Sequence, residues 1–113
     1  MKLVRRSEAN EYKNSDACTA FEYQMNDKDI NGAVIRLNGR YPDSGQVTNK
    51  VCKELVYVIK GSGKVVAEGQ ETELNEGDLA MIMPGEKYYF AGDLEMFMPC
   101  TPAWYAEQHE EAE

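Results

Sequence analysis

Glycine, proline and other turn-forming residues divide this sequence into short segments, most of which have the composition of β-strands. Between the turns the residues are β-branched, aromatic or alternately apolar and polar, and a helical period is rare. Many short strands separated by turns indicate an all-β sandwich or barrel. The sequence predicts strands over residues 19–25, 32–38, 54–60, 64–69, 70–74, 79–83, 87–92 and 94–99, with a turn at "GSG" (61–63).

The strongest strand signal is "ELVYVIK", residues 54–60. Leu55, Tyr57 and Ile59 form an apolar row on one face of this strand, and Val56 and Val58 lie on the other. A strand that is apolar on both faces is expected to be covered on both sides. One face would line the interior, and we expect a second copy of the chain to cover the other face, which gives a homodimer.

Length, charge and cysteine count restrict the class of protein. The 113 residues suit a single domain. The net charge of -8, from 20 acidic and 12 basic residues, argues against binding to nucleic acid or to membrane surfaces, which both need a basic face. No apolar run is long enough for a membrane span or a signal peptide. Three cysteines without paired spacing favour buried, reduced thiols, and we therefore expect a cytoplasmic protein.

Two segments resemble the sequence motifs of the cupin superfamily. The first, "GQVTNKVCKELVYVIKGSG" (45–63), has a glutamate, Glu54, and a closing glycine, Gly61, with six residues between them. The second, "GDLAMIMPGEKYYFAG" (77–92), has the leading glycine and the Pro84-Gly85 turn, although Met83 replaces the motif's first proline and Gly92 its asparagine. The resemblance implies a jelly-roll β-barrel over residues 1–113, with an N-terminal arm (1–18), the barrel (19–100) and a C-terminal acidic tail (101–113).

The metal ligands typical of cupins are not retained in these motifs. Carried over one residue at a time, the three histidine positions are Thr48, Lys50 and Tyr88, and only the glutamate, Glu54, remains. Lysine repels a cation and threonine is a poor ligand. We therefore expect no metal and no cofactor. A metal-dependent cupin with substituted ligands is the alternative, with sulfur from Cys52, Cys100 and the methionines (Met81, Met83, Met96 and Met98).

The resemblance implies that the same four positions surround the mouth of the barrel. Thr48, Lys50, Glu54 and Tyr88 would then bind a small polar molecule, with Lys50 and Glu54 as an ion pair. This favours a small-molecule binding protein. The alternative is that Lys50 and Glu54 only neutralise each other and bind nothing. Another alternative is an isomerase, epimerase or lyase acting on a carbohydrate-like or oxo-acid substrate, with Glu54 as general base and Tyr88 as proton donor. The sole histidine, His109, is expected in the tail, outside the barrel.

Overall fold

The structure, a computed structural model, describes residues 1–112 and is built almost entirely of antiparallel strands. This confirms the all-β prediction. Of two single-turn 3-10 helices, η1 (Arg6–Glu8) precedes the first strand and η2 (Ala106–Gln108) precedes the last. The strands are β1 (Asn10–Lys13), β2 (Cys18–Tyr23), β3 (Asn31–Tyr41), β4 (Gln46–Asn49), β5 (Lys53–Ala67), β6 (Gln70–Asn75), β7 (Leu79–Ile82), β8 (Lys87–Thr101) and β9 (His109–Ala112).

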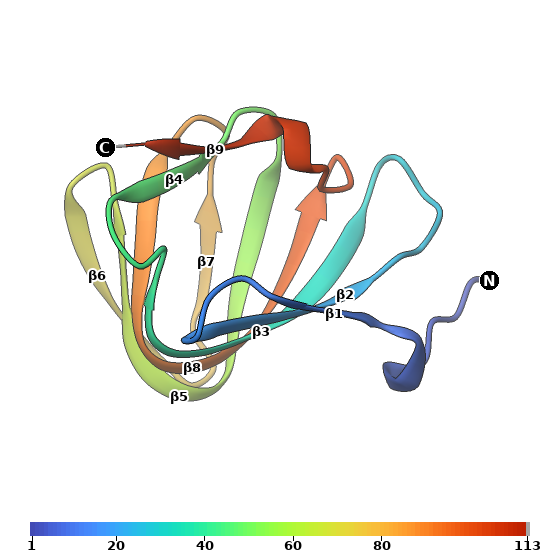
Figure 1. Ribbon diagram of the computed structural model, residues 1–113, viewed down its shortest axis with the longest axis horizontal. Helices are drawn as coiled ribbons and strands as arrows, with labels where there is room; N and C mark the ends of the chain where they lie inside the picture. Colours follow the sequence, from blue (N-terminus) through green and yellow to red (C-terminus); the bar gives the residue numbers. More distant parts are fainter. Residues whose placement is uncertain (113) are drawn as a thin grey trace.

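One sheet curls around on itself to enclose the interior (Figure 1). The strand order is β1-β2-β3-β8-β4-β9, and β5 pairs with β6, β7 and β8. The two longest strands, β5 and β8, curve together through the base of the sheet in Figure 1, while β4 and β9 lie across its opposite end. The interior is therefore covered at the base and bounded at the other end by β4 and β9.

Glycines in register allow the long strands to bend without ending. Gly39, Gly92 and Gly63 lie side by side across β3, β8 and β5. A Cβ on Gly92, whose φ is +133°, would lie 2.7 Å from the carbonyl oxygen of Ser62 on the neighbouring strand. Only glycine fits such a close approach of two backbones. The sequence predicts a turn at 61–63 and two separate strands over 87–92 and 94–99, and both predictions are wrong, because these glycines curve β5 and β8 rather than terminate them.

The core lies inside the curled sheet and follows the alternation of its strands. Val56 and Val58 of β5 are fully buried, whereas Tyr57 and Ile59 are 43% and 40% exposed on the outer face. The inward face of β8 contributes Met96 and its buried neighbours. The buried cluster comprises Cys18, Leu37, Val47, Val56, Val58, Val65, Leu74, Ile82, Tyr88, Phe90, Leu94, Met96 and Met98.

Both ends of the chain contribute strands to the sheet. In the N-terminal arm (1–18), β1 pairs with β2. The C-terminal segment, which the sequence predicts to be a charged tail, contains η2 and then β9, which pairs with β4 in the register Asn49↔His109. Within residues 1–112, no helix is long and apolar enough to cross a membrane.

Candidate functional site

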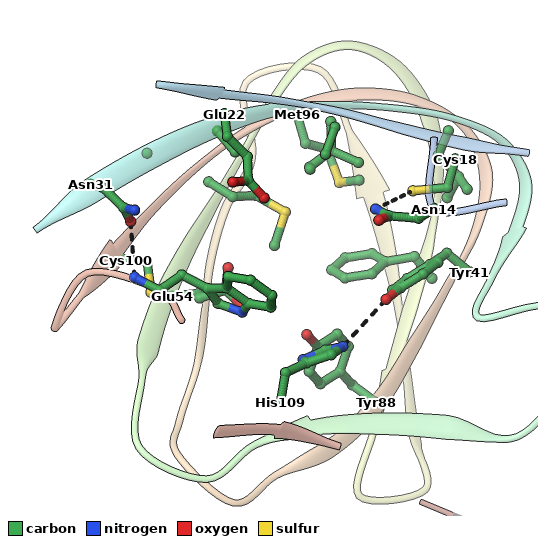
Figure 2. Close-up of a pocket in the computed structure, with 18 residues that line it drawn as sticks. Asn14, Cys18, Glu22, Asn31, Tyr41, Glu54, Tyr88, Met96, Cys100 and His109 are labelled. Atoms are coloured by element: carbon green, nitrogen blue, oxygen red, sulfur yellow. Dashed lines mark hydrogen bonds between the residues drawn. The ribbon is translucent and has the colours of Figure 1, made fainter. Parts of the chain in front are cut away.

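A cavity of about 180 Å³ opens inside the curled sheet, between the base and the β4–β9 end (Figure 2). Its walls come from β2, β3, β5, β8, β9 and the loop that follows β8. Apolar side chains such as Ile35 and Met98 make up much of the surface. The titratable and polar groups most relevant to chemistry are Glu22, Asn31, Tyr41, Glu54, Tyr88 and His109.

Asn49, the last residue of β4, holds two of these groups through its amide nitrogen. Its side chain is 1% exposed. Nδ2 donates one hydrogen bond to Oε1 of Glu54 and a second, of 3.3 Å, to the hydroxyl oxygen of Tyr88. Strand pairing brings these residues together, since β4 lies beside β8, and β8 lies beside β5. The carboxyl group of Glu54 is thus fixed against the cavity wall.

The amide oxygen of Asn49 holds the C-terminal segment in place. Oδ1 accepts hydrogen bonds from Nε1 of Trp104 (3.2 Å), Nε2 of Gln108 (2.9 Å) and Nδ1 of His109 (2.7 Å). The other end of the Gln108 amide accepts from the backbone N–H groups of Val51 and Cys52, so this buried glutamine also clamps the loop that leads into β5. One buried asparagine therefore joins the loop, the C-terminal segment and Glu54.

Glu54 occupies a position that favours its neutral form. Burial raises the pKa of its carboxyl group from 4.5 to about 7, although hydrogen bonds from Asn49 and Tyr88 to the carboxylate oppose the shift. The group is therefore about half protonated near neutral pH. A carboxyl group in this state can either donate or accept a proton, which is the property required of a general acid or base.

His109 is held in one tautomer and in its neutral form. Because the oxygen of Asn49 can only accept, Nδ1 of His109 carries the proton and Nε2 has the free lone pair. The hydroxyl of Tyr41 lies 3.3 Å from Nε2 and donates to it, because burial raises the pKa of Tyr41 to about 12 and keeps the phenol protonated. Burial also lowers the pKa of His109. The ring is therefore neutral at pH 7, where Nε2 is available as a base.

The structure brings together only two of the four residues proposed from the family motifs. Glu54 and Tyr88 line the cavity. Thr48 is buried but faces away from the cavity, because residues 47 and 49 take the inward positions on β4, and its hydroxyl has no hydrogen-bond partner within residues 1–112. Lys50 is exposed and pairs with Glu110 at 3.3 Å, so the predicted ion pair with Glu54 is wrong. The alternation of β4 places Asn49 where Lys50 was expected.

The position of His109 differs most from the prediction. Its predicted location outside the barrel is wrong, since its ring lines the cavity and contacts Tyr41 and Asn49. Its surroundings in sequence, "EQHEEAE", are acidic and give no strand signal. Backbone pairing with β4 makes this segment a strand although its own sequence does not favour one, and it places His109 directly opposite Asn49. The same pairing makes Asn49 important, and neither residue belongs to a family ligand position.

The motif residues do not fit the metal that cupins typically hold. With Lys50 at the surface and Thr48 facing away, Glu54 is the single family ligand left at the cavity. Among residues 1–112, no three His, Cys, Asp or Glu side chains are grouped so that they could hold a metal ion. No step of the chemistry below is therefore assigned to a metal.

The sulfur-bearing side chains named in the alternative prediction have packing and hydrogen-bonding roles. Met81 and Met83 are 52% and 44% exposed on the outside of the sheet. The thiols of Cys52 and Cys100 both donate to the carbonyl oxygen of Pro102, at 3.4 Å and 3.2 Å. Burial is the main cause that raises the pKa of both thiols, and a protonated thiol is a poor metal ligand. These residues are accounted for by packing and hydrogen bonding.

Sequence comparison decides the family. The sequence profile described as "Cupin domain" matches residues 39–99, which is more than half of the chain. The chain is a cupin. Its jelly-roll barrel and both motif segments belong to that superfamily, as the resemblance predicted. No curated protein matches the sequence.

Solved structures extend the likeness of this cupin to its full length. The structure described as Pac13, "a unique nucleoside dehydratase", is 14% identical with a TM-score of 0.91, covering 100% of this chain and 92% of that one. A structure of Streptomyces PAC13 with uridine is 16% identical with a TM-score of 0.87, covering 96% of this chain and 88% of that one. Ectoine synthase from P. lautus is 14% identical with a TM-score of 0.75, covering 100% of this chain and 91% of that one. At these identities the likeness establishes the fold of the cupin and not its activity.

Proposed function

We propose that this cupin is an acid–base lyase that removes water from a small hydroxylated carbonyl compound of the carbohydrate type. The observation that carries the proposal is the Asn49 amide, which holds a neutral imidazole at one end and a carboxyl group with a pKa of about 7 at the other. A base and an acid in one cavity are what such an elimination requires. The acidic and basic groups are both redox-inert, as this redox-neutral reaction needs.

His109 is the base in the first step. Its Nε2 lone pair removes a proton from the carbon next to the substrate carbonyl, and the electron pair of that C–H bond moves onto the carbonyl oxygen as an enolate. The Tyr41 hydroxyl, which donates to Nε2 in the free protein, turns to donate to this oxygen when substrate enters. The hydrogen bond from Nδ1 to Asn49 holds the ring in the required tautomer.

Glu54 is the acid in the second step. The enolate re-forms the carbonyl, a carbon–carbon double bond forms, and the β-hydroxyl leaves with the Glu54 proton as water. The Glu54 carboxylate is then stabilised by hydrogen bonds from Asn49 and Tyr88. Exchange with solvent returns the proton from His109 to the carboxylate. Tyr88 is almost fully buried and has a strongly raised pKa, so it positions Glu54 and does not itself transfer the proton.

The comparisons support this choice among the functions open to the fold. The structural neighbours include a nucleoside dehydratase, which is a lyase, and a cupin structure with bound uridine. The sequence favoured a binding protein, and with His109 expected outside the barrel it offered no histidine for catalysis. That reason is removed by the position of His109 in the cavity. Binding without turnover is the competing function, and the experiment below separates the two.

The test is turnover of sugars and nucleoside derivatives that carry an aldehyde or ketone and a hydroxyl on the β carbon. We expect water loss, followed by mass spectrometry, and incorporation of deuterium from D2O at the α carbon. His109→Gln should lower kcat by about 10²–10⁴-fold, the usual contribution of a positioned acid or base. Deuterium-free, unchanged substrates across the panel, despite measurable binding, would refute the lyase and leave a binding protein.

The pH dependence of kcat/KM provides a second test. We expect a bell-shaped profile, because activity needs neutral His109 and protonated Glu54. The acid limb follows the pKa of His109, which burial lowers below 6.5, and the alkaline limb follows the pKa of Glu54 at about 7. His109 is the sole histidine, so its ring gives a single imidazole signal whose titration by NMR must match the acid limb. A limb at any other pH removes His109 from the proposed role.

We also propose that a second copy of the chain covers the outer face of β5 and β7. Phe97, Tyr57 and Leu79 lie in one row across β8, β5 and β7 and are 41–62% exposed. Light scattering at micromolar concentration should give twice the 12.8 kDa chain mass, and Leu79→Asp should give the monomer mass. The matched change Leu3→Asp, in the exposed segment before η1, should leave the dimer intact. A monomeric wild type would contradict the dimer.

The three cysteines fit the cytoplasmic location proposed from the sequence. Cys18, Cys52 and Cys100 are free and buried. Unpaired thiols are usual in reducing compartments.

A further inference from the structure

Two polar side chains of the cavity lining, Glu22 and Asn31, are not used by the proposed reaction. Glu22 lies on β2 and Asn31 on β3, and Figure 2 shows the Glu22 carboxylate directed into the open space. They lie on the same face of neighbouring strands, because Glu22 pairs with Ala33, two residues from Asn31. A ligand in the cavity would meet these groups as well as Glu54 and His109.

Both residues have hydrogen-bonding capacity left over. Oε2 of Glu22 accepts one bond, of 3.2 Å, from the exposed Gln24 side chain, and Oε1 accepts none within residues 1–112. Oδ1 of Asn31 accepts from the backbone N–H of Trp104 at 3.1 Å, so its amide nitrogen is left to donate into the cavity. A carboxylate that accepts two O–H groups, beside an amide that donates to a hydroxyl oxygen, matches vicinal hydroxyls.

The charge of the lining restricts the ligand further. Among the residues that line the cavity, the charged ones are Glu22 and Glu54, and no Lys or Arg is present. A second hollow, which shares Tyr41 and His109 with the cavity, is lined by Asp43, Glu110 and Glu111 and again by no Lys or Arg. Lys50 pairs with Glu110 but lines neither. A phosphate or carboxylate would therefore enter a negatively charged space without a cation to bind it.

We propose that the cavity binds an uncharged ribose unit, with its vicinal hydroxyls on the Glu22 carboxylate and the Asn31 amide, and that its acidic lining excludes phosphorylated or carboxylated sugars. This inference deepens the proposed lyase function, on which it rests for the orientation of the substrate. It removes oxo acids from the substrate classes considered from the sequence. Trp104 links this pair of residues to Asn49, because its backbone N–H donates to Asn31 and its ring N–H donates to Asn49.

The test is isothermal titration calorimetry of the untagged protein with uridine, D-ribose, 2′-deoxyuridine and uridine 5′-monophosphate. We expect uridine to bind at least tenfold more tightly than its 2′-deoxy and 5′-phosphate counterparts, the usual effect of losing a hydrogen bond to a charged group or of placing an anion beside carboxylates. Equal affinity for ribose and uridine identifies a free sugar, whereas tighter binding of uridine identifies a nucleoside. Both results support the inference.

Glu22→Gln tests the residue itself. Uridine should bind about tenfold more weakly to this variant, while 2′-deoxyuridine changes little, so the preference for ribose disappears. Glu73→Gln, on the exposed strand β6, makes the same change in net charge and should leave all four affinities unchanged. Thermal melts of both variants verify that they fold.

Three results would overturn the inference: uridine monophosphate binding as tightly as uridine, a ribose preference that survives in Glu22→Gln, or no binding of either uridine or ribose at millimolar concentration. These failures differ from failure of the lyase. Turnover of a phosphorylated sugar would overturn this inference and leave the acid–base reaction standing. Selective binding of uridine, with no proton exchange in any carbonyl substrate, would do the opposite.

Discussion

Replacing Glu54 by glutamine should strongly reduce turnover and, at pH 8, make the folded protein more stable than the wild type. Glutamine resembles the protonated carboxyl but cannot supply the proton, so kcat should fall by about 10²–10⁴-fold. Stability should rise because burial penalises the charged form of Glu54. A pKa raised from 4.5 to about 7 corresponds to a cost of up to roughly 3 kcal/mol once the group is ionised.

The direction of the pH dependence follows from the raised pKa. The stabilising contribution of protonated Glu54 is fully present below pH 4.5 and is lost as pH rises through about 7. Glu54→Gln cannot ionise at this position, so it does not lose this stability as the pH rises. Its unfolding free energy, measured by urea denaturation, should therefore match the wild type at pH 4.5 and exceed it by about 1–3 kcal/mol at pH 8. Glu73→Gln is the control. A Glu54→Gln variant that is less stable at pH 8 would show that Glu54 is a structural carboxylate and not a strained functional one.

The second large effect is expected for Asn49→Ala. Five hydrogen bonds end on this side chain, and its loss leaves buried donors of Gln108 and His109 without partners. Each unsatisfied buried group costs about 1–3 kcal/mol, so the variant should be destabilised by roughly 3 kcal/mol or more. Asn38→Ala, on an exposed part of β3, should change the unfolding free energy by less than about 0.5 kcal/mol.

Asn49→Asp separates positioning from simple stability. An aspartate retains an oxygen for Trp104, Gln108 and His109 but no longer donates to Glu54, and its negative charge lies against that carboxyl. The pKa of Glu54 should rise further, which moves the alkaline limb of the pH–rate profile to higher pH. A purely structural asparagine would alter the amount of folded protein without moving that limb. An unmoved limb would therefore remove Asn49 from the positioning role.

The sequence predicted the scaffold better than the site, for physical reasons that particular residues illustrate. Val56 and Val58 show their burial through local alternation, and the family motifs place Glu54 and Tyr88 correctly at the cavity. The same alternation predicts the wrong inward-facing residue at β4. On the short strand β4, a shift of one residue exchanges Lys50 for Asn49 at the inward position and so replaces a predicted ion pair by a hydrogen-bonded amide.

His109 could not be found by any local signal. Its place in the cavity follows from pairing between β4 and β9, which are far apart in the chain, and its neighbours are charged. The glycines of β5 and β8 mislead for a related reason, because glycine serves tight turns and bends within strands equally well. Such ambiguities are resolved only when the neighbouring strand is known, as Gly63 opposite Gly92 shows.

The Asn49 amide also has a consequence for how the protein folds. Its five partners lie 5, 39, 55, 59 and 60 residues away along the chain, so four of its hydrogen bonds each close a long loop. Closing such loops costs chain entropy before any contact repays it, and topologies rich in distant contacts fold slowly. Glu54 and His109 therefore come together around Asn49 only when strands from most of the chain have docked. Without β9, His109 cannot lie against Asn49, so this part of the cavity forms late in folding.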